Sequence, residues 1–259
     1  SGEKVLADRL LDFGPEPYDL FEQGDNWVSL NLTAGRSVAC VDRNGDGQYG
    51  IYVSNYGGPS RFYEVDGTEV EDISIQLGID RTTGGRAVVS GHILGPRNDI
   101  FAANERGVNF LYQNIDGRFL DRAVEYGVDD TTQNGRGTAL ADILYDGRLG
   151  IIIGNWNGYH RVYVPLRNSF LDYATDEFRE PSKVRTVISA DFDNDGYDEI
   201  FFNNIGQPNR MFRVREGGLL EPVLLSAALE ANGLGTGAAV ADIDNDGVLD
   251  LLVAHGESA

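Results

Sequence analysis

Two loops near the C-terminal end of the chain carry acidic side chains at a regular spacing. Each loop has carboxylates at its first, third, fifth and ninth positions and a glycine at its sixth. These carboxylates are Asp191, Asp193, Asp195 and Glu199 in one loop, and Asp242, Asp244, Asp246 and Asp250 in the other. Oxygen donors that alternate around a sharp turn can converge on one cation, and calcium accepts about six to eight oxygens where magnesium requires a tighter octahedron. The spacing predicts two calcium sites, with the backbone carbonyls of Tyr197 and Val248 as seventh-position ligands.

An EF-hand starts with the same letters but differs in two respects. It requires a bidentate glutamate at position twelve and a helix on each side. Position twelve is Phe202 in the first loop and Val253 in the second, and the flanking segments are short apolar runs typical of strands. The sequence therefore predicts a calcium loop between two strands.

Three further loops occupy equivalent places and retain the pattern to decreasing degrees. The first retains three donors, Asp42, Asn44 and Asp46, and predicts a weak site. The loop from Asp142 retains two donors, and the loop from His92 retains essentially none. Because one loop form recurs along the chain, we interpret calcium as an architectural ion that pins each loop between two strands.

The loops recur because the whole chain is an internal repeat of about 50 residues, with units starting near residues 35, 85, 135, 184 and 235. About four short strands per unit, separated by turns rich in Gly, Asn and Asp, are typical of propeller blades. The last unit lacks its second half, and residues 17–32 look like a second half without a first. We therefore expect an all-β fold over residues 1–259, a single β-propeller of about five four-stranded blades. The last blade would be completed by N-terminal strands of the same chain or of a neighbouring chain.

The charge of the chain excludes some classes of partner. It has 41 acidic and 21 basic residues, a formal net charge of -20. Nucleic acid and anionic membrane surfaces would be repelled. No run reaches the ~18 apolar residues of a membrane-spanning helix, so membrane insertion is not expected.

One arginine recurs in four units, at the start of the strand expected to line the central channel. These residues are Arg36, Arg86, Arg136 and Arg185. A ring of guanidinium groups could hold an anion, because the planar fork suits carboxylate and phosphate. The alternative is that the arginines pair with neighbouring acidic residues.

Other side chains suggest weaker hypotheses. Tyr56, Trp156 and Tyr159 could present aromatic faces to sugars or pack neighbouring blades together. The three histidines show no nucleophile arrangement, and the sequence contains no GxSxG, HExxH or phosphate-binding glycine loop, so no enzyme is predicted. Cys40 lies in an apolar inner strand and is expected to be a buried, inert thiol. Asn31 begins the only N-glycosylation sequon.

The repeat carries a family resemblance. The strings GRSVACVDRNGDG, NDIFAANERG, ADFDNDG and LLVAHGES resemble the FG-GAP or VCBS repeats of integrin α-subunit propellers, and more closely the cartilage acidic protein and ASPIC/UnbV family. The resemblance implies a secreted, calcium-binding propeller that acts in the extracellular matrix or at the cell surface, without a known enzymatic activity. Family propellers usually have about seven repeats, against five found here. Three roles stay open: a module that binds protein on its faces, a subunit of a head-to-tail filament, and a glycan-binding propeller.

Overall fold

The computed structural model describes residues 34–66, 69–226 and 233–256. Within these ranges the chain is all-β and forms antiparallel four-stranded units, which we call blades 1 to 4, followed by a two-stranded unit. The prediction that residues 17–32 complete the last blade lies outside the described residues, as does the sequon at Asn31.

The strands of each blade follow one another along the chain. Blade 1 contains β1 (Ala34–Val41), β2 (Gly50–Pro59), β3 (Arg61–Asp66) and β4 (Glu69–Asp72). Blade 2 contains β5 (Thr82–Gly91), β6 (Asp99–Asn104), β7 (Phe110–Ile115) and β8 (Arg118–Asp121). Blade 3 contains β9 (Gly135–Ala141), β10 (Gly150–Asn155), β11 (Arg161–Pro165) and β12 (Phe170–Asp172). Blade 4 contains β13 (Val184–Ala190), β14 (Glu199–Asn204), β15 (Arg210–Arg215) and β16 (Leu219–Val223), and the last unit contains β17 (Leu234–Ala241) and β18 (Asp250–Gly256).

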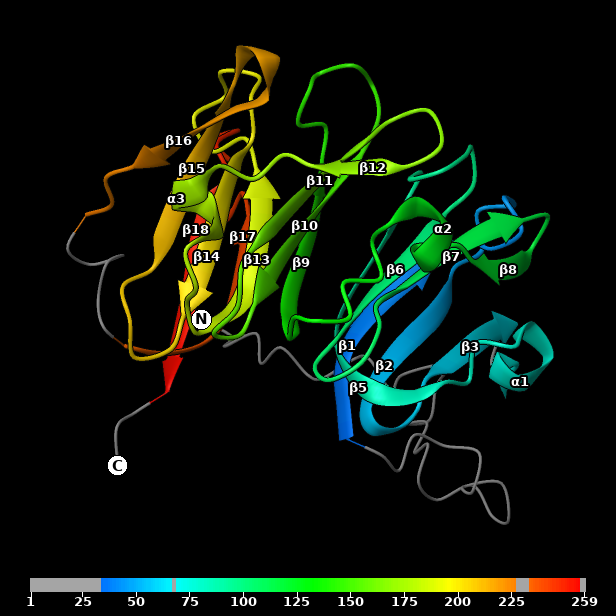
Figure 1. Cartoon of the computed structure of the whole chain (residues 1–259). Coiled ribbons are helices and arrows are strands. Elements are labelled where there is room, and N and C mark those ends of the chain that lie inside the picture. The colour runs from blue at the N-terminus through cyan, green and yellow to red at the C-terminus, as the bar shows by residue number, and fades with distance from the viewer. Residues whose placement is uncertain (1–33, 67–68, 227–232, 257–259) are drawn as a thin grey trace, which may run out of the picture.

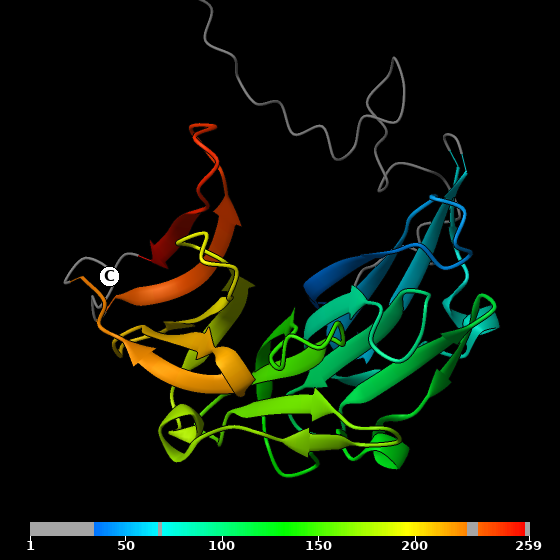
Figure 2. The same ribbon diagram turned by 90° about the horizontal axis from the view of Figure 1, so that it is seen from above.

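The blades lie around an arc, with the first strand of each blade on the inside (Figure 2). The described strands at the two ends of the arc, β1 and β17–β18, lie apart from each other in this view. Blades 1 and 2 share one sheet because β2 continues past its own blade and pairs with β5 from Tyr56↔Gly84 to Pro59↔Thr82. This arrangement confirms the predicted all-β, propeller-like fold.

The second strand of each blade explains the apolar runs in the sequence. All six residues of β6, of β10 and of β14 are buried. These strands carry hydrophobic side chains on both faces because a neighbouring blade covers each face of the sheet. One such layer packs Ile152 and Val162 of blade 3 against Phe202 and Phe212 of blade 4.

Single helical turns connect the blades, and the repeat pattern did not predict them. They are α1 (Ser74–Leu77), α2 (Ala123–Tyr126) and α3 (Asp176–Arg179), with a 3-10 turn at Glu216–Gly218 inside blade 4 (Figure 1). α1 and α2 each end at a glycine in the left-handed conformation, Gly78 and Gly127. Four residues are too few for a helical hydrophobic period, so sequence periodicity cannot reveal them.

A recurring asparagine closes the hairpin between the second and third strands. Its side-chain amide donates to the carbonyl oxygen four residues later, over 2.6 to 2.7 Å. The four asparagines are Asn55, Asn104, Asn155 and Asn204. Because these hairpins have the same clamp in each blade, the third strands start at equivalent places.

Candidate metal centre

The acidic loops join the first and second strands of a blade and share one backbone shape. The fourth loop residue has a positive φ in four of the loops, at Gly45, Tyr145, Asn194 and Asn245. The sixth residue of the same loops is a glycine with φ between 84° and 88°. Asparagine and glycine tolerate the left-handed region best. Backbone preference supports this loop shape at the glycines and asparagines, whereas Tyr145 adopts it against its preference, and the donor set differs from loop to loop.

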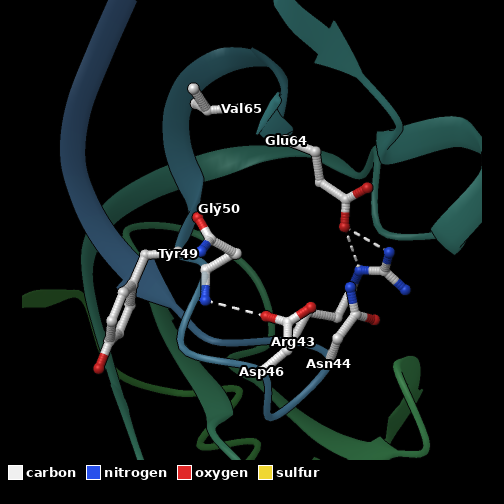
Figure 3. A pocket seen from close by; sticks show the side chains of 8 residues that line it. Arg43, Asn44, Asp46, Tyr49, Gly50, Glu64 and Val65 are labelled. Carbon is white, nitrogen blue, oxygen red and sulfur yellow. Dashed lines mark hydrogen bonds and ion pairs between the residues drawn. The ribbon is translucent and has the colours of Figure 1, made fainter. Parts of the chain in front are cut away.

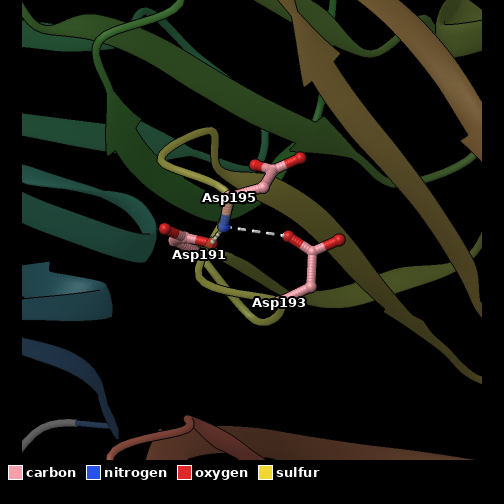
Figure 4. Close-up of side chains that lie close together, drawn as sticks. All are labelled: Asp191, Asp193 and Asp195. Atoms are coloured by element: carbon pink, nitrogen blue, oxygen red, sulfur yellow. Dashed lines mark hydrogen bonds between the residues drawn. The ribbon is translucent and has the colours of Figure 1, made fainter.

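The loop after β13 brings three of its predicted ligands together. One carboxylate oxygen from each of Asp191, Asp193 and Asp195 lies within 4.8 Å of the others (Figure 4). Asp191 accepts hydrogen bonds from the backbone amides of Asp195 and Gly196, at 3.2 and 2.9 Å. The turn folds around the first carboxylate, and this brings the third and fifth side chains to the same side. The cluster is a candidate site for an oxygen-seeking cation.

Two arginines of β15 lie against this cluster. Arg213 forms ion pairs with Asp193 and with Glu199, and Arg215 lies 3.3 Å from Asp195. Their guanidinium groups offset part of the repulsion among the loop carboxylates. A bound cation would compete with these arginines for the same oxygens.

Glu199, the predicted ninth-position ligand, is not part of the three-carboxylate group. It is 1% exposed and accepts hydrogen bonds from the backbone amide of Phe192 at 3.0 Å and from Nε of Arg213 at 2.6 Å. The carboxylate thus closes the base of the loop. Its role as a metal ligand, like that of the Tyr197 carbonyl, stays a prediction.

The loop after β17 gathers a different trio. Carboxylate oxygens of Asp242, Asp244 and Asp250 lie within 4.8 Å of one another. In this loop the ninth residue, Asp250, belongs to the trio. It also accepts a hydrogen bond from the backbone amide of Ile243 at 3.0 Å. Asp246 instead accepts from the backbone amide of Val248 at 2.8 Å. The Val248 carbonyl stays a predicted ligand.

The loop after β1, predicted as the weak site, forms no such trio among the described residues. Asp42 accepts from three backbone amides, those of Gly45, Asp46 and Gly47, at 2.7 to 3.2 Å. Arg97 of the next blade's loop donates to the carbonyl of Asn44. The third donor, Asp46, accepts from the backbone amide of Gln48 at 2.9 Å.

A pocket of about 320 Å³ opens beside this loop. Asp46, Tyr49 and Val65 line it, and Arg43 closes one side by an ion pair with Glu64 (Figure 3). A cation there would have to compete with the Arg43 guanidinium.

In the remaining two loops the carboxylates contact an arginine or backbone amides. Asp146 pairs with Arg148 in the loop after β9, and this pairing lowers the pKa of Asp146. In the loop after β5, Asp99 accepts backbone hydrogen bonds from Leu94 at 2.6 Å and Asn114 at 2.7 Å. Asp99 therefore closes its loop as Glu199 does, and it belongs to no carboxylate cluster of the described residues.

Neighbouring loops contact one another. The Asn194 side chain donates to the carbonyl of Gly247, at 3.0 Å, and so joins the two loops that hold the carboxylate trios. The Tyr145 ring lies edge-on to Tyr197 with centroids 4.3 Å apart, and its hydroxyl accepts from the backbone amide of Asp198. A change in the conformation of one loop would therefore alter the contacts of that loop with the next blade.

The pairing alternative holds for two of the four repeated arginines, since Arg86 and Arg136 form ion pairs with Glu105. The rings of Tyr56 and Trp156 lie against arginines as in blade packing, while Tyr159 is 56% exposed. The prediction for Cys40 was wrong, because this thiol is exposed. It lies on β1 at one end of the arc, where much of the strand is exposed.

His160, one of the three histidines for which the sequence shows no nucleophile arrangement, is fully buried. Its Nδ1 accepts from the backbone amide of Asn155 at 2.9 Å, and its Nε2 lies 2.9 Å from Oγ of Ser182. Burial and the nearby Arg210 lower the pKa of His160 to about 3. The equivalent residues Asn109 and Asn209 offer the same acceptor in blades 2 and 4, so His160 serves the fold.

Comparison with known proteins supports the repeat. A family model described as an FG-GAP-like repeat matches residues 191–253, the segment that contains both carboxylate trios. Within the described part of the chain, no helix is long and apolar enough to cross a membrane. Among solved structures, BBS1N in complex with ARL6DN, soaked with lead, has a TM-score of 0.56 over 86% of this chain and 65% of its own, at 11% identity. That likeness concerns the fold alone.

The sequence relatives cover the chain from end to end. It is 48% identical to human "Cartilage acidic protein 1" and 43% identical to the Xenopus tropicalis protein of that name. Both alignments cover 100% of this chain, which spans 44% of each relative. The relatives carry the name of a cartilage protein and not that of an enzyme. This chain is therefore similar over its full 259 residues to less than half of cartilage acidic protein 1, and its residues 191–253 match an FG-GAP-like repeat.

Proposed function

We propose that this chain is a non-enzymatic, calcium-binding β-propeller of the extracellular space that serves in protein interaction or matrix scaffolding. The observation that carries the proposal is the pair of carboxylate trios in neighbouring loops, at Asp191 and at Asp242. Three carboxylates within 4.8 Å repel one another, and a divalent cation with flexible oxygen coordination removes that repulsion. The extracellular location rests on the name and similarity of the relatives.

Calcium would act on the fold through the loops. Asp191, Asp193 and Asp195 would hold one ion, and Asp242, Asp244 and Asp250 a second. With a dissociation constant near ~10 µM, about 1 mM calcium would stabilise the folded state by about 2.7 kcal/mol per site. The Asn194 to Gly247 hydrogen bond couples the loops, so both ions would stiffen the contact between blade 4 and β17–β18.

Thermal unfolding in calcium and in chelator tests this proposal. We expect about 1 mM calcium to raise the melting temperature by roughly 10–20 °C, since the two sites together contribute about 5.4 kcal/mol and about 1 kcal/mol shifts a domain of this size by roughly 2–4 °C. The double variant Asp193→Asn with Asp244→Asn removes one charge from each trio and still accepts the loop hydrogen bonds, so it should lose most of this rise. Asp116→Asn is the matched control, because Asp116 is an exposed aspartate with positive φ, outside both trios. A wild-type melting temperature that does not respond to calcium would refute the proposal.

A second candidate is self-assembly by strand addition. Among the described residues β18 pairs only with β17, and no described strand covers its other edge. Unpaired strand edges bind other strands, and a heterologous contact that does not close gives a filament. Light scattering after size exclusion, in calcium and in chelator, separates the two functions. A single species of 28.3 kDa would support the monomeric interaction module. A series of multiples of that mass would support the filament.

A further inference from the structure

The four repeated arginines occupy the same backbone irregularity in every blade. Along β1, Gly35 pairs with Asn55 and Ser37 with Ser54, which leaves Arg36 as an extra residue without a partner across the strands. The same register shift leaves out Arg86, Arg136, Arg185 and, on β17, Thr236. A β-bulge turns the side chain of the extra residue away from the regular alternation. The bulge therefore sets the direction of each guanidinium group.

These arginines form a continuous chain of contacts across the blades, which we call the arginine belt. Its members, in spatial order, are Arg36, Tyr56, Arg86, Glu105, Arg136, Trp156 and Arg185. The guanidinium carbons of Arg86 and Arg136 lie 4.1 Å from the Tyr56 ring centroid and 4.4 Å from the Trp156 ring centroid, respectively. Arg36 and Arg185 lie at 5.8 and 5.2 Å from the same two rings. Tyr56, Glu105 and Trp156 each follow the clamp asparagine of their blade.

The belt carries more positive charge than its partners neutralise. It contains four guanidinium groups and one carboxylate, Glu105, in a chain whose net charge is -20. Among the described residues, Arg36 and Arg185 form no ion pair, and both are exposed. Burial lowers the pKa of Arg136, as do Arg86 and Arg185.

One buried donor of the belt lacks a hydrogen-bond acceptor within the part of the chain that the structure describes. The Arg136 side chain is 10% exposed, and its Nε is buried without a hydrogen-bond acceptor among the described residues. A buried donor without an acceptor costs about 1–3 kcal/mol. This Nε is closed to a ligand in the structure, so an oxyanion would first meet the exposed guanidinium groups of Arg36 and Arg185.

We propose that the arginine belt binds a tetrahedral oxyanion, a sulfate or phosphate group, at the end of the propeller opposite to the acidic loops. The inner strands run from the belt to the acidic loops, since Arg36 lies near the start of β1 and Asp42 follows its end. Guanidinium forks present several parallel N–H donors to such an oxyanion, which a chloride ion cannot match. The same chemistry fits a free anion and a sulfate ester on a saccharide. The two ends of the propeller would then take ligands of opposite charge.

Titration calorimetry tests the belt with sodium sulfate as probe and sodium chloride at equal ionic strength as reference. We expect saturable binding of sulfate by the wild-type protein. The double variant Arg36→Gln with Arg185→Gln should weaken this binding by at least tenfold, and it breaks no ion pair of the described residues. Arg118→Gln, a change of an exposed arginine on the outer strand β8, should leave the affinity unchanged.

Two results would overturn the proposal: wild-type heats that match those of chloride, and a double variant that binds sulfate as tightly as the wild type. An O-sulfated disaccharide in the second arm separates the sources. Tighter binding than free sulfate indicates an ester group, and equal or weaker binding indicates the free anion. If the double variant does not fold, the arginine Nε–H signals of the wild-type protein in NMR replace it. Sulfate must then shift the belt signals, assigned by single Arg→Lys changes, and unshifted signals would reject the site.

Discussion

Protonation of His160 should make the folded state less stable in mild acid. The ring is fully buried, stacks on Phe202 with centroids 4.9 Å apart, and uses Nδ1 to accept from the Asn155 amide. A proton on Nδ1 would face that N–H group, and Ser182 already donates its hydroxyl to Asn204 at 2.8 Å. The folded protein therefore holds this histidine neutral, with a pKa of about 3.

The sign and size of the effect follow from proton linkage. The histidine titrates near its ordinary pKa of about 6.5 in the unfolded chain, so below that pH the unfolded state binds a proton that the folded state does not. The contribution of His160 is fully present above about pH 6.5 and is lost as the pH falls toward 3. At pH 5 the loss amounts to about 2 kcal/mol relative to pH 8.

Urea unfolding of the wild type and of His160→Asn, at pH 8 and at pH 5, measures this term. Asparagine stands at the equivalent positions 109 and 209 and supplies the same acceptor. The variant should cost about 1–3 kcal/mol at pH 8, because the ring contact with Phe202 is lost. Its stability should then fall by about 2 kcal/mol less than that of the wild type between the two pH values. Carboxylates titrate alike in both proteins, so an equal fall in both would show that the reasoning about His160 is wrong.

Three further predictions concern the packing of the blades. Gly84→Ala should lower the free energy of unfolding in urea by at least about 2 kcal/mol, because its Cβ would lie 1.7 Å from the Glu105 carbonyl oxygen. Gly237→Ala is the control: no atom lies within 4 Å of its Cβ, so it should cost less than about 1 kcal/mol. Asn204→Ala removes a hairpin clamp and should cost about 1–3 kcal/mol in the same assay; a loss below about 0.5 kcal/mol would contradict the role of the clamp. Cys40 should react with a thiol reagent in the native state as fast as in urea, and protection in the native protein would contradict its exposure.

Local patterns in the sequence predict much of the fold. The period of about 50 residues, the apolar second strands and the turn residues predict strands and their order, because these signals depend on neighbours in the chain. The loop donors Asp191, Asp193 and Asp195 are likewise two residues apart, so their convergence follows from the turn itself. The sequence does not predict the helical turns α1, α2 and α3 between the blades, because a single turn has no periodic signal.

Long-range contacts decided what the local patterns left open. In the two acidic loops the ninth carboxylate has different roles. Arg213, on another strand, pairs with Glu199, while Asp250 stays with its trio. The exposure of Cys40 depends on which blade covers β1, and no residue next to it encodes that.

The chain sequence by itself determined the repeat, the all-β fold and the acidic loops, because each depends on residues within one blade. Only the tertiary structure decided the partners of the repeated arginines. Spacing showed that they recur, but Arg86 lies against Tyr56 of blade 1 and Arg136 pairs with Glu105 of blade 2, so these contacts join neighbouring blades. They form between residues about 30 positions apart in the chain, where packing and not local preference sets the distance.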